Sequence, residues 1–185
     1  MHHMRRLVTA IAADGVSRVS SVGPVTARRE TGGGGLIEEV WHTRSLDRQA
    51  FEPDQSQLRF PDFSPGAGGS SCRVVHIPPD AQRWADAAAA GEMAQAIGAD
   101  RPARWLKRHP GMHVTQTLDY ALLLRGRLTM VMEDGEIELE PGDVVVQQAA
   151  VHAWKNTGHE TAVLFVVMLG LQEQAVELQE ESRNG

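Results

Sequence analysis

The sequence predicts an all-β fold, either a β-sandwich or a small antiparallel barrel. The main observation is that strand-like runs and turn signals alternate without interruption from residue 112 to residue 170. Short strands separated by frequent turns are typical of sandwiches and barrels. Two further β-prone regions precede this core, and only one stretch of the chain is rich in helix-forming residues. The six strand-like runs of the core are HVTQTLDYALLL, RLTMVME, EIELE, DVVVQQ, HAWKN and TAVLFVVML.

The N-terminal part predicts a hairpin followed by two strands. In RRLVTAIAADGVSRVSSV, residues 5–22, two β-prone arms flank Asp14-Gly15, a dipeptide that tolerates the positive φ of a tight hairpin turn. LIEEVWHT and CRVVHIPP are β-compatible, and the two prolines end the second of these strands. The segment between them is rich in proline, glycine and serine, which indicates an irregular loop.

One helical insert interrupts the strands. DAQRWADAAAAGEMAQAIGAD, residues 80–100, is rich in alanine, with Asp80 in place for an N-cap and Gly98 as a stop signal. We expect RPARWLKRHPG, which follows, to be a loop. The chain then reads as one domain, 1–185, with N-terminal strands in 5–79, a helical insert in 80–108, a barrel core in 112–170 and a C-terminal tail in 171–185 whose start is helical.

Composition excludes several classes of partner. The 185 residues include 18 Lys plus Arg and 24 Asp plus Glu, a net charge of -6, which argues against nucleic-acid binding. Cys72 is the only cysteine, so no intrachain disulfide forms. No apolar run approaches the roughly 20 residues that span a bilayer, and the N-terminus does not read as a signal peptide. We therefore expect a cytoplasmic protein without membrane partners.

Two motifs in the core point to a known family. The segment from Met112 to Met168 resembles the cupin superfamily, whose fold is a double-stranded β-helix or jelly-roll barrel. The first family motif, His-x-His followed by Glu and Gly, is matched by His113, Thr115, Asp119 and Gly126. The second, which begins Pro-Gly-Asp and ends His-x-x-x-Asn, is matched by Pro141, Gly142, Asp143, His152 and Asn156.

The resemblance implies a metal site, and this chain departs from the family pattern there. Thr115 replaces the second histidine, and Asp119 replaces the glutamate. The remaining ligands would be His113, Asp119 and His152, a set that suits Fe(II) and that Mn, Ni or Zn would also accept. We expect the two histidines to approach each other inside the barrel, with Asp119 near them. The alternative is a barrel without metal, in which His113 and His152 are hydrogen-bonded interior groups or serve as acid and base.

The same face of the barrel is expected to bind the ligand. Thr115 shares a strand face with His113, and Trp154 shares one with His152, where it could form an aromatic wall. Gln147 and Gln148 alternate, so one of them faces the interior, and we assign Gln148 to the ligand. The function that follows is binding of a small organic molecule by a cupin enzyme of the dioxygenase, decarboxylase, isomerase or dehydratase type. Fold resemblance does not choose among these reactions.

Two expectations remain. A binding or sensor module without metal or catalysis is the competing function, because one family ligand is missing. A homodimer is expected, because the N-terminal hairpin leaves a sheet edge unpaired in a monomer and the family resemblance points the same way.

Overall fold

The computed structural model describes residues 4–45, 63–86, 88, 90–92, 95 and 102–172. Its strands form a six-stranded sheet in the order β3-β4-β5-β11-β6-β9, a three-stranded sheet in the order β10-β7-β8, and the separate hairpin β1-β2. All these pairings are antiparallel. The strands are β1 Arg5–Ile11, β2 Ser17–Pro24, β3 Arg28–Thr31, β4 Gly35–Thr43, β5 Ser70–Ile77, β6 Thr117–Arg125, β7 Leu128–Val131, β8 Glu136–Leu139, β9 Val144–Gln148, β10 Ala153–Lys155 and β11 Ala162–Gly170.

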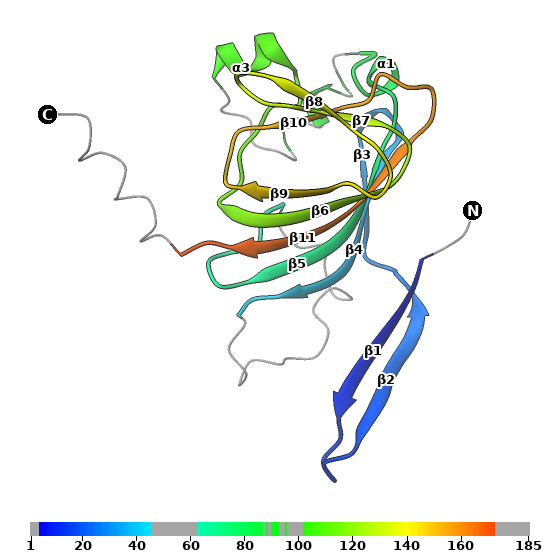
Figure 1. Ribbon diagram of the computed structural model, residues 1–185. Coiled ribbons are helices and arrows are strands. Elements are labelled where there is room, and N and C mark those ends of the chain that lie inside the picture. The colour runs from blue at the N-terminus through cyan, green and yellow to red at the C-terminus, as the bar shows by residue number, and fades with distance from the viewer. Residues whose placement is uncertain are drawn as a thin grey trace, which may run out of the picture.

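The two larger sheets face each other, and the core fills the space between them (Figure 1). β6 and β11 lie side by side in the large sheet and alternate their side chains between its two faces. The buried core includes Ala121, Leu123, Leu128, Leu164, Val166 and Met168. The predicted all-β, jelly-roll fold is therefore confirmed. The strands before the helical insert, β3 to β5, form half of the large sheet, and β5 pairs directly with β11.

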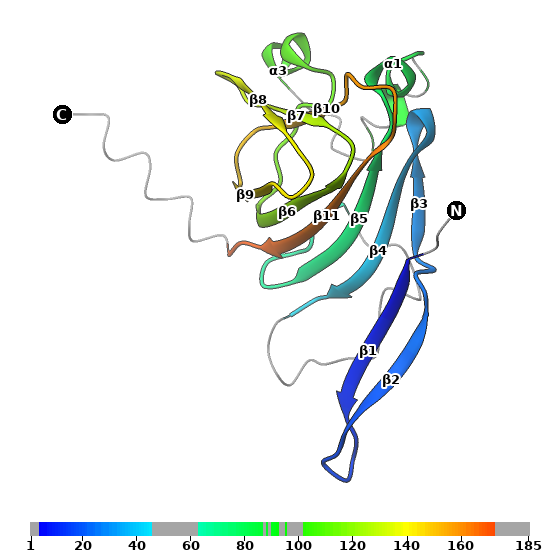
Figure 2. The ribbon, with the colours of Figure 1, turned by 45° about the vertical axis from the view of Figure 1, so that its right-hand side comes forward.

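The predicted N-terminal hairpin is present and extends away from the sandwich (Figure 2). Its turn contains Gly15 at φ 79°, a positive value of the kind that the Asp-Gly dipeptide predicts. Large apolar side chains are exposed along it: Leu7, Ile11, Val16, Val19 and Val22. The outer face of the large sheet is also apolar, with Tyr120, Leu124, Val144 and Val146 exposed on β6 and β9.

The helical insert differs from its prediction in two respects. α1 spans only Asp80–Arg83, and Pro79 occupies the N-cap position, so Asp80 is the first helical residue and not the cap. α3, Ala103–Arg108, stands where a loop was expected, because Pro102 fixes the backbone before a run of helix-forming residues. A short 3-10 helix, Gly32–Gly34, joins β3 to β4.

Some expectations lie outside the described residues. These are residues 87, 89, 93–94 and 96–100 of the stretch 80–100 predicted to be helical, part of the loop before β5, and the tail from 173 onward; the described residues 88, 90–92 and 95 are helical, as predicted. In the part of the chain that is described, no helix combines the length and apolar character needed to cross a membrane.

Candidate functional site

His113 and His152 form a direct pair. Each backbone N–H donates to the carbonyl of the other, at 2.9 and 3.0 Å, in an isolated antiparallel bridge between the segments that lead into β6 and β10. Residues paired in this way project to the same face of the sheet. Their ring centroids are 4.5 Å apart, and both side chains are buried. The expected approach of the two histidines is therefore present in the structure.

The hydrogen bonds of the pair fix where each imidazole carries its proton. His113 Nδ1 lies 2.9 Å from the Gly111 carbonyl, and His152 Nδ1 lies 3.0 Å from the Ala150 carbonyl. A carbonyl can only accept, so each Nδ1 donates and each Nε2 is the basic nitrogen. Burial lowers the pKa of His152, against the smaller opposing effect of its bond to Ala150. His152 is therefore a neutral imidazole at pH 7.

Asp119 lies in the same cavity with an unused hydrogen-bonding atom. Thr117 and Asp119 lie on one face of β6, and the hydroxyl of Thr115, just before the strand, is 2.7 Å from that of Thr117. Burial raises the pKa of Asp119, and a hydrogen bond from Thr117 and the charge of Arg73 oppose this. Within the described residues, the buried Asp119 Oδ1 has no hydrogen-bond partner. A buried acceptor of this kind is costly unless something binds it.

A buried ion pair that the sequence analysis did not predict borders the cavity. Arg73 donates from Nε and Nη2 to Glu39 Oε2, both at 3.0 Å, and from Nη1 to the Phe63 carbonyl at 2.6 Å. Ser71 donates to the other oxygen of Glu39 at 2.7 Å. Burial raises the pKa of Glu39, against the opposing charge of Arg73 and the bond from Ser71. The available signal was strand alternation, which puts Ser71 and Arg73 on one face of β5.

The cavity has a volume of about 90 Å³, room for several waters or one small organic molecule. His113, Asp119 and His152 line one part of it, together with the predicted ligand residue Thr115. The predicted aromatic wall, Trp154, also lines it, with its ring centroid 5.4 Å from that of His152. The remaining lining is largely apolar and includes Ile37, Val75, Ile77, Ala121, Val166 and Met168.

The assignment of Gln148 to the ligand is wrong. Gln148 is exposed, whereas Gln147 is buried and donates from Nε2 to the Ala150 carbonyl at 2.6 Å. The register of β9 against β6 sets this phase, because it pairs Gln147 with Asp119 and Gln148 with Leu118. Gln147 therefore supports the turn that leads to His152 and does not line the cavity.

The side chains present do not fit the three-ligand metal site that the motifs implied. Among the described residues, no three His, Cys, Asp or Glu side chains are grouped closely enough to hold a metal ion. The two histidines are together, but Thr115 cannot supply the missing imidazole. Asp119 is one methylene shorter than the family glutamate, and Thr117 bonds its carboxyl. The Asp119 carboxylate thus belongs to the cavity wall without completing a ligand set.

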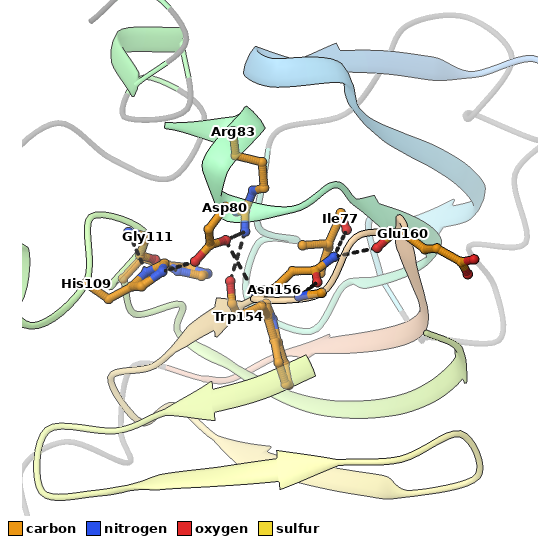
Figure 3. Close-up of polar contacts among 10 residues, drawn as sticks. Ile77, Asp80, Arg83, His109, Gly111, Trp154, Asn156 and Glu160 are labelled. Atoms are coloured by element: carbon orange, nitrogen blue, oxygen red, sulfur yellow. Dashed lines mark hydrogen bonds and ion pairs between the residues drawn. The ribbon is translucent and has the colours of Figure 1, made fainter. Parts of the chain in front are cut away.

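A second polar network closes the end of the sandwich next to the histidine pair. Figure 3 shows Asp80 between Arg83 and His109, at 3.3 and 2.8 Å from their nitrogens. Arg83 also donates to the Trp154 carbonyl at 2.9 Å. The backbone N–H of Asn156 donates to Asp80 at 3.2 Å, so this network ties α1 to the end of β10. Sequence reasoning missed it, because it treated Asp80 as a cap and His109 as a lone histidine.

Asn156, the last residue of the second motif, holds the backbone together in the same region. It is 1% exposed, and its side-chain amide donates to the carbonyls of Ile77 and Glu160 at 2.8 and 2.9 Å. Its Oδ1 accepts from the backbone N–H of Gly158 at 2.9 Å. The motif thus ends on a residue that fixes the chain after β10, beside the cavity and not in it.

Comparison with known proteins adds a family match for the region of the histidine pair. Residues 101–168 match the family model described as Cupin domain. Phomopsin biosynthesis cluster protein C' of Diaporthe leptostromiformis is 37% identical over 68 residues, covering 36% of this chain and 35% of that protein. The cupin-domain-containing oxidoreductase fogC of Aspergillus ruber is 39% identical over 62 residues, covering 31% and 30%. The match therefore spans about a third of the length of these curated relatives.

A solved structure also resembles this chain. The cupin domain of Schizosaccharomyces pombe Cnp3 aligns with a TM-score of 0.46 and 11% identity, covering 91% of this chain and 89% of that one.

Proposed function

Because the chain belongs to the cupin superfamily, we propose that its cavity binds a small neutral organic molecule and that the histidine pair moves a proton on it. The observation that carries this proposal is the pair itself. His113 and His152 lie side by side in the cavity wall, and each has its Nδ1 proton donated to a carbonyl. Each therefore presents Nε2 as a base, which is the state a general base needs at neutral pH.

An isomerisation by proton transfer is the reaction class that needs no cofactor and no group of the protein beyond those in the cavity. One Nε2 takes a proton from a carbon next to a carbonyl, and the resulting imidazolium returns that proton to another atom of the same molecule. No electron acceptor is required, and the atoms balance. In this scheme Asp119 Oδ1 accepts a hydrogen bond from a hydroxyl or N–H of the ligand, which satisfies its buried oxygen.

The charges around the cavity favour a neutral ligand over an anionic one. Arg73 and Arg83 both line the cavity, and both are bonded within the protein, Arg73 to Glu39 and the Phe63 carbonyl and Arg83 to Asp80 and the Trp154 carbonyl. The apolar wall and Trp154 suit a ring or a short hydrocarbon body. The names of two relatives place them in biosynthesis clusters, which supports a substrate from small-molecule biosynthesis.

The test uses a panel of neutral hydroxylated aromatic and enolisable carbonyl compounds. Binding is measured by calorimetry, and proton abstraction is measured by NMR as incorporation of deuterium from D2O into a bound compound. We expect exchange with the wild type and a loss of at least about 100-fold in His113→Gln, the scale of general-base catalysis. Gln148→Ala is the matched control, because this exposed glutamine lies outside the cavity, and it should behave as the wild type.

Two outcomes would contradict the proposal. Binding without exchange above the buffer rate would identify a binding or sensor module. Absence of binding across the panel would reject the neutral ligand.

An oxidoreductase is the second candidate, favoured by two relatives that are named cupin-domain-containing oxidoreductases. Metal analysis of protein purified without a polyhistidine tag decides it. Near-stoichiometric Fe, Mn, Ni or Zn would support this candidate over metal-free proton transfer.

A further inference from the structure

We propose that Asp80 and His109 are positioning residues for His113, acting through the backbone of Gly111. Neither residue belongs to the two motifs, and neither lies among the residues assigned above to ligand or proton. The inference makes His113, and not His152, the proton acceptor, and it rests on the proposed function for that assignment. The observation behind it is a continuous line of three hydrogen bonds that runs from the Asp80 carboxylate to the His113 ring.

The three contacts are all short. Asp80 Oδ2 lies 2.8 Å from His109 Nε2, and the Gly111 N–H donates to His109 Nδ1 at 3.0 Å. The other side of the Gly111 residue completes the line, because its carbonyl accepts from His113 Nδ1 at 2.9 Å. Figure 3 shows the first part of this line, with His109 between Asp80 and Gly111.

The direction of each bond follows from the chemistry of the groups. A backbone N–H can only donate, so His109 Nδ1 is the acceptor and carries no proton. The His109 proton is therefore on Nε2 and is donated to Asp80. All three bonds point the same way, from His113 toward the carboxylate. The N–H and C=O of Gly111 belong to successive peptide groups joined at its Cα, so the line acts by fixing the Gly111 backbone in the orientation that aims its carbonyl at His113 Nδ1.

The surroundings keep this line ordered and away from water. His109 is buried, and Trp84 packs edge-on against it with ring centroids 5.8 Å apart. Burial opposes ionisation of Asp80, but bonds from His109 and the Asn156 N–H outweigh it and lower the pKa of Asp80, so the carboxylate is charged. A Cβ at position 111 would lie 3.1 Å from His109 Nδ1, tighter than most real contacts. Glycine therefore lets the peptide lie against the imidazole.

His152 has a different environment. Its Nδ1 bonds the Ala150 carbonyl, and that same carbonyl also accepts from Gln147 Nε2 at 2.6 Å. A carbonyl shared with a second donor is a weaker acceptor for the imidazole. The two neighbouring rings therefore differ: His113 is connected to a carboxylate and His152 to a neutral amide. An imidazolium formed at His113 keeps a carbonyl acceptor that is unshared among the described residues and that Asp80 and His109 hold in place, whereas the acceptor of His152 is shared.

The experiment reads the tautomer of each ring at one fixed pH, without ligand. The full chain is labelled with 15N-histidine, and the ratio of Nδ1–H to Nε2–H is measured for His113 and His152 by NMR. In His109→Phe we expect this ratio to fall at His113 by up to about fivefold, because the variant removes the one hydrogen bond that holds the Gly111 backbone and leaves the carbonyl of Gly111 to move away from His113. His152 should not change, which makes it the internal reference. Asp80→Asn should shift His113 in the same direction, since it removes the charge and keeps the shape.

The matched control is His76→Phe. His76 bonds Glu38 at 2.9 Å, a histidine–carboxylate contact of nearly the same length that does not connect to His113. An unchanged His113 ratio in both test variants would overturn the inference, and so would an equal change at His152 or in the control. If His109→Phe does not fold, Asp80→Asn decides alone. Because no ligand is present, this result is independent of whether the protein catalyses the proposed proton transfer.

Discussion

Removing the side-chain amide of Asn156 should destabilise the protein strongly, although Asn156 itself does not line the cavity. Asn156→Ala deletes three hydrogen bonds, to the Ile77 and Glu160 carbonyls and from the Gly158 N–H. Asn156 is 1% exposed, so water does not readily replace the lost partners. The segment after β10 would then lose its attachment to the end of β5.

The magnitude follows from the number of bonds. Each intramolecular hydrogen bond contributes about 1 kcal/mol net, so three give about 3 kcal/mol. For a domain of this size, 1 kcal/mol corresponds to roughly 2–4 °C in Tm, so the expected loss is about 6–12 °C. Loss on this scale is a large part of a typical stability of about 5–15 kcal/mol.

The assay is thermal and urea unfolding, followed by tryptophan fluorescence and circular dichroism. Lys155→Ala is the control, because the neighbouring Lys155 makes a half-exposed ion pair with Glu136, and such pairs contribute about 0–1 kcal/mol. A Tm for Asn156→Ala within about 2 °C of the wild type would refute the reasoning, as would an equal loss in the control.

Three further predictions concern charge, pH and assembly. Arg73→Met should lower the free energy of unfolding, measured in urea, by about 3–5 kcal/mol, because it leaves Glu39 buried without its cation. Adding Glu39→Gln should restore much of that stability, and a double variant no more stable than Arg73→Met would contradict the prediction. The lowered pKa of His152 means that the unfolded chain binds more protons than the folded one, so stability should fall as the pH drops below 6.5, the ordinary pKa of histidine. Between pH 7.5 and 5.5 the Tm of the wild type should fall by more than that of His152→Gln, and an equal fall in Tm would contradict the prediction. The chain should sediment as a homodimer at micromolar concentration, because an isolated hairpin such as β1–β2 has marginal stability in water and its exposed apolar side chains can pack against a second copy. Val19→Thr should weaken the dimer, and a monomeric wild type would refute the prediction.

The sequence alone determined the strands, the hairpin and the positions of the two histidines. Alternation of period two and turn chemistry are local properties, so they can be read from neighbouring letters. Motif spacing placed His113 and His152 on segments that the fold brings together. The sequence could not determine which of Gln147 and Gln148 faces inward, because an alternating strand is compatible with either residue on the inner face.

Only the tertiary structure decided the partners of the charged residues. His109 and Asp80 are 29 positions apart, Arg73 and Glu39 are 34 apart, and Asn156 reaches Ile77 across 79 positions. Contacts of this kind depend on strand order and register, which local periodicity does not encode. The physical reason is that pairing β5 with β11 and β4 brings buried polar groups of distant segments within hydrogen-bond reach, where each must find a partner.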